Sequence, residues 1–335
     1  MNAGFYIIMA AQFCSSLADN ALLVAAIALL MQADSPSWLT PYLKFFFVVS
    51  YVVLAPYVGA FADRLPKGQV MFVANTIKVA GCALMLFNVN PLAAYALVGL
   101  GAAAYSPAKY GILTEYLPPT KLVAANGWIE GLTVGSIILG TVLGGVLIHD
   151  KVAHLLLQFN VPILDTGIDT PPEAAITVIC VIYVLAALFN LYIPRTGAPI
   201  KPLPAHPADT LRDFAGCVAS LWKDRLGQIS LAVTTLFWGA GATLQFIVIE
   251  WSKVALGYSL SQASILQGVC ALGIALGAVA ASMRVRLDRA VGVIPLGIAM
   301  GLVVILMIVV TNVWMAVPLI ITIGLLAGYF VVPMN

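Results

Sequence analysis

Long apolar segments separated by short polar connections make up most of this 335-residue chain. The segments are rich in Leu, Val, Ile, Ala and Gly, and apolar residues do not alternate with polar ones. Because about 20 apolar residues suffice for a helix to cross a bilayer, the pattern predicts membrane-spanning helices and excludes barrel strands. Ten spans are predicted, near 5–31, 42–63, 69–88, 91–117, 121–148, 173–193, 227–250, 259–283, 290–310 and 313–334.

The composition agrees with an all-α polytopic membrane protein and gives no sign of an enzyme. Hydrophobic residues make up 62% and charged residues 9% of the chain, whereas about a quarter of a soluble domain is charged. A net charge of +2 is too small and dispersed for a nucleic-acid partner. The histidines and cysteines lack metal-ligand spacing, and neither a nucleotide-binding loop nor a nucleophile elbow occurs. We therefore expect no catalytic residues, no metal and no cofactor.

Lysines and arginines predict the orientation, because short cytoplasmic loops are enriched in them. With the N-terminus inside the cell, most of these residues fall in cytoplasmic connections. They are Arg64, Lys67, Lys121, Arg195, Lys201, Arg212, Lys223, Arg225, Arg284, Arg286 and Arg289. The opposite side holds little beyond Lys44, Lys151 and Lys253. The sequence therefore predicts a cytoplasmic N-terminus.

A polar segment over residues 194–226 separates the first six spans from the last four. It begins Pro-rich and then places apolar residues at helical spacing opposite charged ones. This pattern predicts an amphipathic helix, either on the cytoplasmic membrane surface or packed on the protein. We therefore expect a six-helix bundle over 1–193, a cytoplasmic linker over 194–226 and an incomplete bundle over 227–335.

The two bundles share weak sequence features, as duplicated transporter halves do. Gly59-Ala60-Phe61-Ala62 ends the second predicted span, and Gly277-Ala278-Val279-Ala280 ends the eighth. A six-plus-six design would need two more helices after Asn335, so we expect that the sequence is shortened. A native ten-helix protein is the alternative.

A short segment between the second and third spans, Gly59 to Gly68, contains Asp63, Arg64 and Lys67. It resembles the signature loop of the major facilitator superfamily, which implies that fold and a conformational latch formed by Gly59, Asp63, Arg64 and Lys67. On physical grounds Asp63 can cap a helix N-terminus, while the two basic residues face the anionic inner leaflet. An ordinary basic turn is the alternative.

A second resemblance extends over essentially the whole chain and rests on four segments. They are Gln12-Phe13 through Leu17-Ala18-Asp19-Asn20-Ala21-Leu22-Leu23, Ala102 to Leu113 with Tyr105-Ser106-Pro107-Ala108-Lys109-Tyr110-Gly111, Leu236 to Gly241, and Tyr329 to Asn335. Together they resemble the bacterial lysophospholipid transporter family, whose members have twelve helices. One departure is Gln245, where the family often has a basic residue.

The second resemblance implies a substrate and partners. It implies movement of lysophospholipids, chiefly lysophosphatidylethanolamine, across the inner membrane to the cytoplasmic leaflet. Membrane lipids surround such a protein, and a partner acyltransferase/acyl-carrier-protein synthetase re-acylates the product.

Charged residues inside the spans are candidate binding residues, because each costs at least about 2.5 kcal/mol at mid-helix. Asp19, with Asn20 beside it, lies deepest and could accept an ammonium headgroup or a proton, or serve a structural hydrogen bond. Lys78, Lys109 and Glu130 are predicted at one depth, where they could bind phosphate or form a permanent bridge.

Two further residues complete the candidate set. Tyr105 precedes Lys109 by one turn on the same face and could contact a headgroup or pack in the core. Glu115, near the end of its span, is interpreted as structural.

Two other functions remain open from the residues alone. A proton-coupled exporter of drugs or other amphipaths would use the same fold, with Asp19 as its protonation site. The second alternative is a membrane scaffold that docks the acyltransferase and transports nothing.

Overall fold

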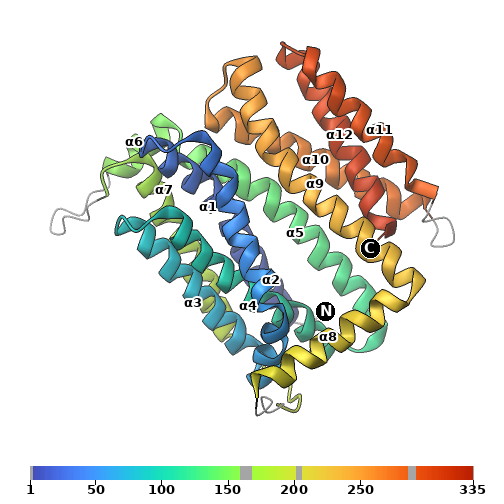
Figure 1. The fold of residues 1–335 in the computed structure, drawn as a ribbon. Coiled ribbons are helices and arrows are strands. Elements are labelled where there is room, and N and C mark those ends of the chain that lie inside the picture. Colours follow the sequence, from blue (N-terminus) through green and yellow to red (C-terminus); the bar gives the residue numbers. More distant parts are fainter. Residues whose placement is uncertain (1–2, 159–167, 201–205, 286–291, 335) are drawn as a thin grey trace. The chain divides into compact units, whose positions relative to one another are not determined.

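The computed structural model of the chain describes residues 3–158, 168–200, 206–285 and 292–334, and these residues form helices and connecting loops without strands (Figure 1). The elements are α1 (Ala3–Gln32), η1 (Ser37–Leu39), α2 (Thr40–Arg64), α3 (Lys67–Leu86), α4 (Pro91–Tyr116), α5 (Pro119–Leu147), α6 (Asp150–Gln158), α7 (Pro171–Leu191), α8 (Pro207–Lys223), α9 (Arg225–Leu256), α10 (Leu260–Arg284), α11 (Pro295–Leu306), η3 (Met307–Val309) and α12 (Val313–Met334). Each predicted span overlaps one of these helices. The first two residues of the span predicted near 290–310 lie outside the described residues, and its helix α11 covers only Pro295–Leu306. The short helix α6 was not predicted separately.

The apolar character of the helices fits a protein that crosses a membrane several times. Within the described residues, six helical segments are individually long and apolar enough to span a bilayer: α1, η1 with α2, α3, α7, α10 and α12. A seventh results if the end of α5 and α6, which meet at a 71° bend, are counted as one span. The remaining predicted spans are present as the helices α4, α9 and α11.

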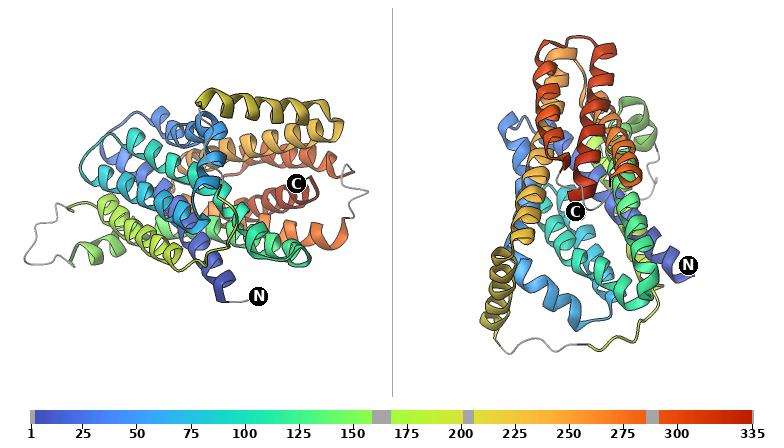
Figure 2. Two further views of the ribbon diagram at one scale, coloured as in Figure 1. Left: turned by 90° about the horizontal axis from the view of Figure 1, so that it is seen from below. Right: turned by 90° about the vertical axis from the view of Figure 1, so that its right-hand side faces the viewer.

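The helices gather into two compact units. Unit 1 comprises residues 1–136 and 146–217, and unit 2 comprises 137–145 and 218–335. Helix α5 therefore contributes to both units, and the boundary in sequence falls inside α8. Within unit 1, α3 packs on α4 and α7, α2 packs on α4, and α1 packs on α7. Within unit 2, α10 and α12 lie side by side along their length (Figure 2).

Small residues allow the close helix packing that membrane proteins use in place of large apolar side chains. In unit 1, a Cβ at Gly101 of α4 would lie 2.6 Å from the Ala74 backbone oxygen and 2.8 Å from Lys78 Cγ. In unit 2, a Cβ at Gly277 would collide with the backbone of Leu325, and one at Gly328 with that of Ile274. Gly277 and Gly328 thus allow the close crossing of α10 and α12 in unit 2.

Helix α8 is amphipathic, as the sequence predicts, and none of its residues is buried. Its apolar side chains are 38% to 60% exposed and recur on one face: Leu211, Phe214, Val218, Leu221 and Trp222. These exposed apolar residues favour a helix on the membrane surface over one packed on the protein.

Candidate functional site

An ion pair between two helices lies at the centre of a buried polar network in unit 1. The Lys78 ammonium of α3 lies 2.8 Å from each carboxylate oxygen of Asp19 in α1. Tyr183 of α7 donates a hydrogen bond of 2.6 Å to Asp19 Oδ1. The opposite charges offset much of the desolvation that either ion alone would suffer inside an apolar bundle.

The remaining donors and acceptors of the pair are largely satisfied by neighbours on the same helices. Lys78 Nζ donates to Ser15 Oγ at 3.0 Å, and Ser15 donates to Asn75 Oδ1 at 2.7 Å. The ammonium also lies 5.2 Å from the centre of the Tyr105 ring and 5.4 Å from that of Tyr183. Both rings are within the range at which an aromatic face attracts a cation.

The two ions differ in accessibility, and this difference limits what the network can do. The Lys78 side chain is 1% exposed, whereas the Asp19 side chain is 22% exposed. Two buried polar groups beside them, Asn75 Nδ2 and Tyr105 Oη, have no hydrogen-bond partner among the described residues. An incoming cation or hydrogen-bond donor can therefore reach Asp19, while Lys78 stays enclosed.

The structure separates Lys78 from the cluster predicted at one depth with Lys109 and Glu130. Its carboxylate partner is Asp19, because α1 and α3 bring these two residues to the same level. Lys109 lies 3.4 Å from Thr133 Oγ1 of α5 and 4.7 Å from the centre of the Tyr110 ring. The side chain of Glu130 lies outside the described residues, so its pairing stays a prediction.

Asn20 lies beside the ion pair in sequence but turns its amide to its own helix. Its Nδ2 donates to the backbone oxygen of Ser16 at 2.8 Å. The Ser16 hydroxyl in turn accepts a hydrogen bond of 2.6 Å from Ser136 of α5. A polar contact thus links α1 to α5 one turn before Asp19.

Sequence reasoning missed Tyr183, Ser15 and Asn75. Ser15 precedes Asp19 by four residues and Asn75 precedes Lys78 by three, which places each on the face of its ion. Tyr183 interrupts a long apolar run, and a buried tyrosine hydroxyl needs a partner. These helical spacings, and the polar hydroxyl within an apolar run, are the sequence features that could have identified the three residues.

The predicted latch residues form a second polar cluster where α2 ends and α3 begins. Lys67 Nζ lies 2.7 Å from Asp63 Oδ1, 2.8 Å from the Ala62 backbone oxygen and 3.5 Å from Glu115 Oε1. Glu115 also accepts a hydrogen bond of 2.8 Å from Thr196, which follows α7. The cluster connects the ends of α2, α3 and α4 with the segment after α7, which supports the structural interpretation of Glu115.

Two expectations about this cluster are wrong. Asp63 does not cap α3, since the N-cap residue is Pro66 and no side chain caps it. The chain from Gly59 to Arg64 is still part of α2, and Asp63 bonds instead to Lys67, the first residue of α3. Lys67 is only 6% exposed and pairs with carboxylates rather than facing lipid. Arg64 is exposed, as expected.

Neither Gly59 of the predicted latch nor Gln245, which departs from the family pattern, has a contact among the described residues that points to a special role. A Cβ at Gly59 would meet no other atom within 4 Å, so no close contact explains a glycine there.

In unit 2, Gln245 Nε2 lies 3.4 Å from Gln267 Oε1, and Gln267 Nε2 donates to the Gln245 backbone oxygen at 2.8 Å. An uncharged amide pair therefore stands where a basic residue was expected from the family pattern.

Comparison with known proteins gives close relatives. The family model described as "Major Facilitator Superfamily" matches residues 8–335. The "Lysophospholipid transporter LplT" of Serratia proteamaculans (strain 568) is 41% identical over 329 residues, covering 98% of this chain and 78% of that protein. The protein of the same name from Yersinia pestis (strain Pestoides F) is also 41% identical, over 98% of this chain and 76% of its own length.

Solved structures show the same fold at low sequence identity. A bacterial homologue of the human lysosomal transporter Spinster, in an inward-facing and unoccupied conformation, matches all of this chain with a TM-score of 0.68 and 16% identity. It is matched over 75% of its own length. The inward-facing and occupied conformation matches 98% of this chain and 72% of that chain, with a TM-score of 0.66 and 16% identity.

Proposed function

Because the chain belongs to the major facilitator superfamily, and within it to the lysophospholipid transporters, we propose that it moves lysophospholipids across a membrane. The observation that supports this proposal most strongly is the 41% identity over 98% of the chain to a protein named for this activity. We extend the proposal to lysophosphatidylethanolamine, moved to the cytoplasmic leaflet for re-acylation. The ion pair of unit 1 supports it, since a polar headgroup inside a bundle needs a charged partner.

The partly exposed carboxylate of Asp19 is the proposed contact for the headgroup. An ethanolamine ammonium can hydrogen-bond to Asp19 in the way that Lys78 does in the structure. Because the carboxylate has two oxygens and several acceptor positions, the headgroup can share Asp19 with Lys78 or weaken that pair. When the headgroup ammonium shares the carboxylate with Lys78, neither cation is left without a partner in the bundle.

Other polar residues of unit 1 complete the proposed binding set. Tyr105 has a buried hydroxyl without a partner in the described residues and lies over Lys78. Lys109 supplies a positive charge for the substrate phosphate, and Asn20 and Glu130 are assigned as supporting polar groups. Lysine serves phosphate as a point charge, which suits a headgroup that must also leave.

The cluster around Lys67 is the proposed conformational latch, with Gly59, Asp63 and Arg64. Lys67 holds carboxylates of α2 and α4 at once, at 2.7 Å and 3.5 Å. Breaking either contact would free one helix end without exposing an unpaired lysine. Such a two-partner contact can exist in more than one arrangement, which a transporter that changes state requires.

The proposed location is the bacterial inner membrane, with the N-terminus in the cytoplasm. The excess of Lys and Arg in the connections on that side supports this orientation. The proposed partner, an acyltransferase/acyl-carrier-protein synthetase, would use the lysolipid on the cytoplasmic leaflet.

A reconstituted transport assay tests this function against the alternatives. Proteoliposomes would contain fluorescent lysophosphatidylethanolamine in one leaflet, and its transfer would be followed by albumin extraction. We expect protein-dependent transfer without a substrate-induced pH change. A pH change with drug substrates and no lysolipid transfer would identify a proton-coupled exporter, and complex formation without flux would identify a scaffold.

A further inference from the structure

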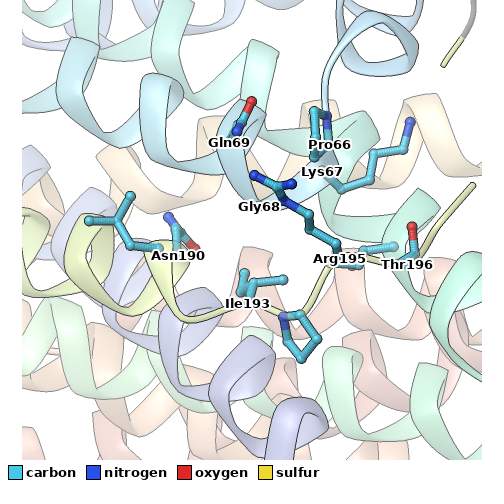
Figure 3. A pocket seen from close by; sticks show the side chains of 11 residues that line it. Pro66, Lys67, Gly68, Gln69, Asn190, Ile193, Arg195 and Thr196 are labelled. Atoms are coloured by element: carbon cyan, nitrogen blue, oxygen red, sulfur yellow. The ribbon is translucent and has the colours of Figure 1, made fainter.

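A small pocket lies in unit 1 where α3 begins and α7 ends, apart from the ion pair of Asp19. It has a volume of about 140 Å³ and is lined by residues of the α3 start, the α7 end and the chain that follows, with Ile112 of α4 (Figure 3). A water molecule occupies roughly 30 Å³ in the liquid. The pocket is therefore large enough for a tetrahedral oxyanion.

The most informative residue of this pocket is Asn190, near the end of α7. Its side chain is 1% exposed, yet neither Oδ1 nor Nδ2 has a hydrogen-bond partner among the described residues. Leaving a buried amide unsatisfied costs about 1 to 3 kcal/mol. Unsatisfied buried polar groups are uncommon in native proteins and indicate a role that packing does not explain.

The start of α3 adds backbone donors beside this amide. Its N-cap is Pro66, and no side chain caps the helix. The N–H groups of Gln69 and Val70 bond to the Pro66 oxygen, at 2.8 Å and 3.1 Å. The earlier N–H groups, of Lys67 and Gly68, belong to the first turn, where no intrahelical acceptor exists. A helix start of this kind attracts anions.

Gly68 places this helix start directly against α7. A Cβ at Gly68 would lie 3.0 Å from the Asn190 backbone oxygen and 3.1 Å from Ile193 Cβ. The backbone oxygens of Phe189 and Asn190 accept hydrogen bonds from Tyr192 and Ile193, at 3.1 Å and 3.3 Å. These bonds reduce the repulsion that free carbonyl oxygens at the end of α7 would exert on an anion.

Arg195 supplies the positive charge of the pocket. Its exposed side chain extends along the pocket toward Gly68 and Gln69, whereas the Lys67 side chain points away (Figure 3). None of the ion pairs among the described residues includes Arg195. The nearby carboxylates Asp63 and Glu115 pair with Lys67 and do not line the pocket.

We propose that this pocket binds a phosphate group, held by the Arg195 guanidinium, the Asn190 amide and the N-terminal N–H groups of α3. A guanidinium matches the oxygens of phosphate with two parallel hydrogen bonds. The phosphate can belong to a membrane lipid headgroup or to a soluble phosphate. The site shares Lys67 and Thr196 with the latch cluster, so its occupancy would stabilise that arrangement.

Two probes on the full chain in detergent test this site and identify the phosphate source. Inorganic phosphate would be titrated by phosphorus NMR line broadening, and dilauroyl phosphatidylglycerol by native mass spectrometry. Arg195→Gln should weaken binding by about tenfold or more, as expected for a lost charged hydrogen-bond pair. The matched control, Arg284→Gln at the exposed end of α10, should leave binding unchanged.

Asn190→Leu separates a ligand site from a packing defect. If the amide binds phosphate, this variant should lose affinity while keeping or gaining thermal stability, because it removes two unsatisfied polar atoms. A loss for only one probe assigns the pocket to that phosphate source. Equal binding by the wild type, Arg195→Gln and Arg284→Gln with both probes, or no binding by the wild type, would overturn the proposal.

Discussion

Lys78 and Asp19 form an ion pair of 2.8 Å in which the lysine is enclosed and the carboxylate is partly accessible. Removing only one member leaves the other charge without a partner, which typically costs about 3 to 5 kcal/mol for buried pairs. Lys78→Met should therefore clearly lower the melting temperature of the protein in detergent. The double variant Asp19→Asn with Lys78→Met should be more stable than Lys78→Met alone.

Thermal unfolding of the two single variants and the double variant measures this coupling. Lys121→Met, at an exposed position, is the matched control and should change little. Additive effects of the two single substitutions would show that the pair does not contribute as a unit.

Tyr183 orients the Asp19 carboxylate through a hydrogen bond of 2.6 Å. Tyr183→Phe removes this bond but keeps the ring near Lys78, and should cost roughly 1.5 to 3 kcal/mol, as for hydrogen bonds to charged groups. Lysolipid transport should slow because the carboxylate loses its fixed position. Tyr192→Phe, at an exposed tyrosine, serves as the control. Unchanged stability and transport in Tyr183→Phe would contradict this role.

Lys67 should affect transport through the latch more than through substrate binding. Lys67→Met leaves Asp63 and Glu115 without their shared cation, so the helix ends should separate more easily. We expect a lower kcat for lysolipid transport with little change in KM, and partial recovery in Lys67→Arg. Lys223→Met, on exposed α8, is the control. A large KM change with normal kcat would instead place Lys67 in substrate binding.

Adding a methyl group to a glycine at the crossing of α10 and α12 should lower the stability of the protein. A Cβ at Gly277 would collide with the backbone of Leu325, so Gly277→Ala forces two helices apart. We expect a loss of at least about 1 to 3 kcal/mol, the usual cost of overpacking. Gly301→Ala, where a Cβ would meet nothing within 4 Å, should be neutral or slightly stabilising. Equal melting temperatures for these two variants would contradict the tight crossing.

The sequence predicted the helical fold and the family correctly, because long apolar runs and short motifs are local features. The comparisons confirm both, and relatives that are transporters agree with the expectation that the chain is not an enzyme. Alternative functions such as drug export are not favoured by these relatives.

The partners of individual charges were harder to predict. Lys78 was expected beside Lys109 and Glu130 because the three lie at similar depths along their helices. Depth does not determine which faces meet, and packing of α1 against its neighbours brings Asp19 to Lys78 instead. Asp63 similarly bonds to Lys67, the first residue of α3, because α2 continues to Arg64 and the Asp63 side chain is not at the start of α3.

The rate of lysophosphatidylethanolamine transfer by Asp19→Asn proteoliposomes, compared with the wild type, tests the central claim most directly. Asparagine keeps the size of the side chain but removes the charge that binds an ammonium group. The proposed role predicts a decrease of about tenfold or more, corresponding to roughly 1.4 kcal/mol, with the control Asp34→Asn near the wild-type rate. Equal rates for Asp19→Asn and the wild type would contradict the claim that Asp19 binds the headgroup.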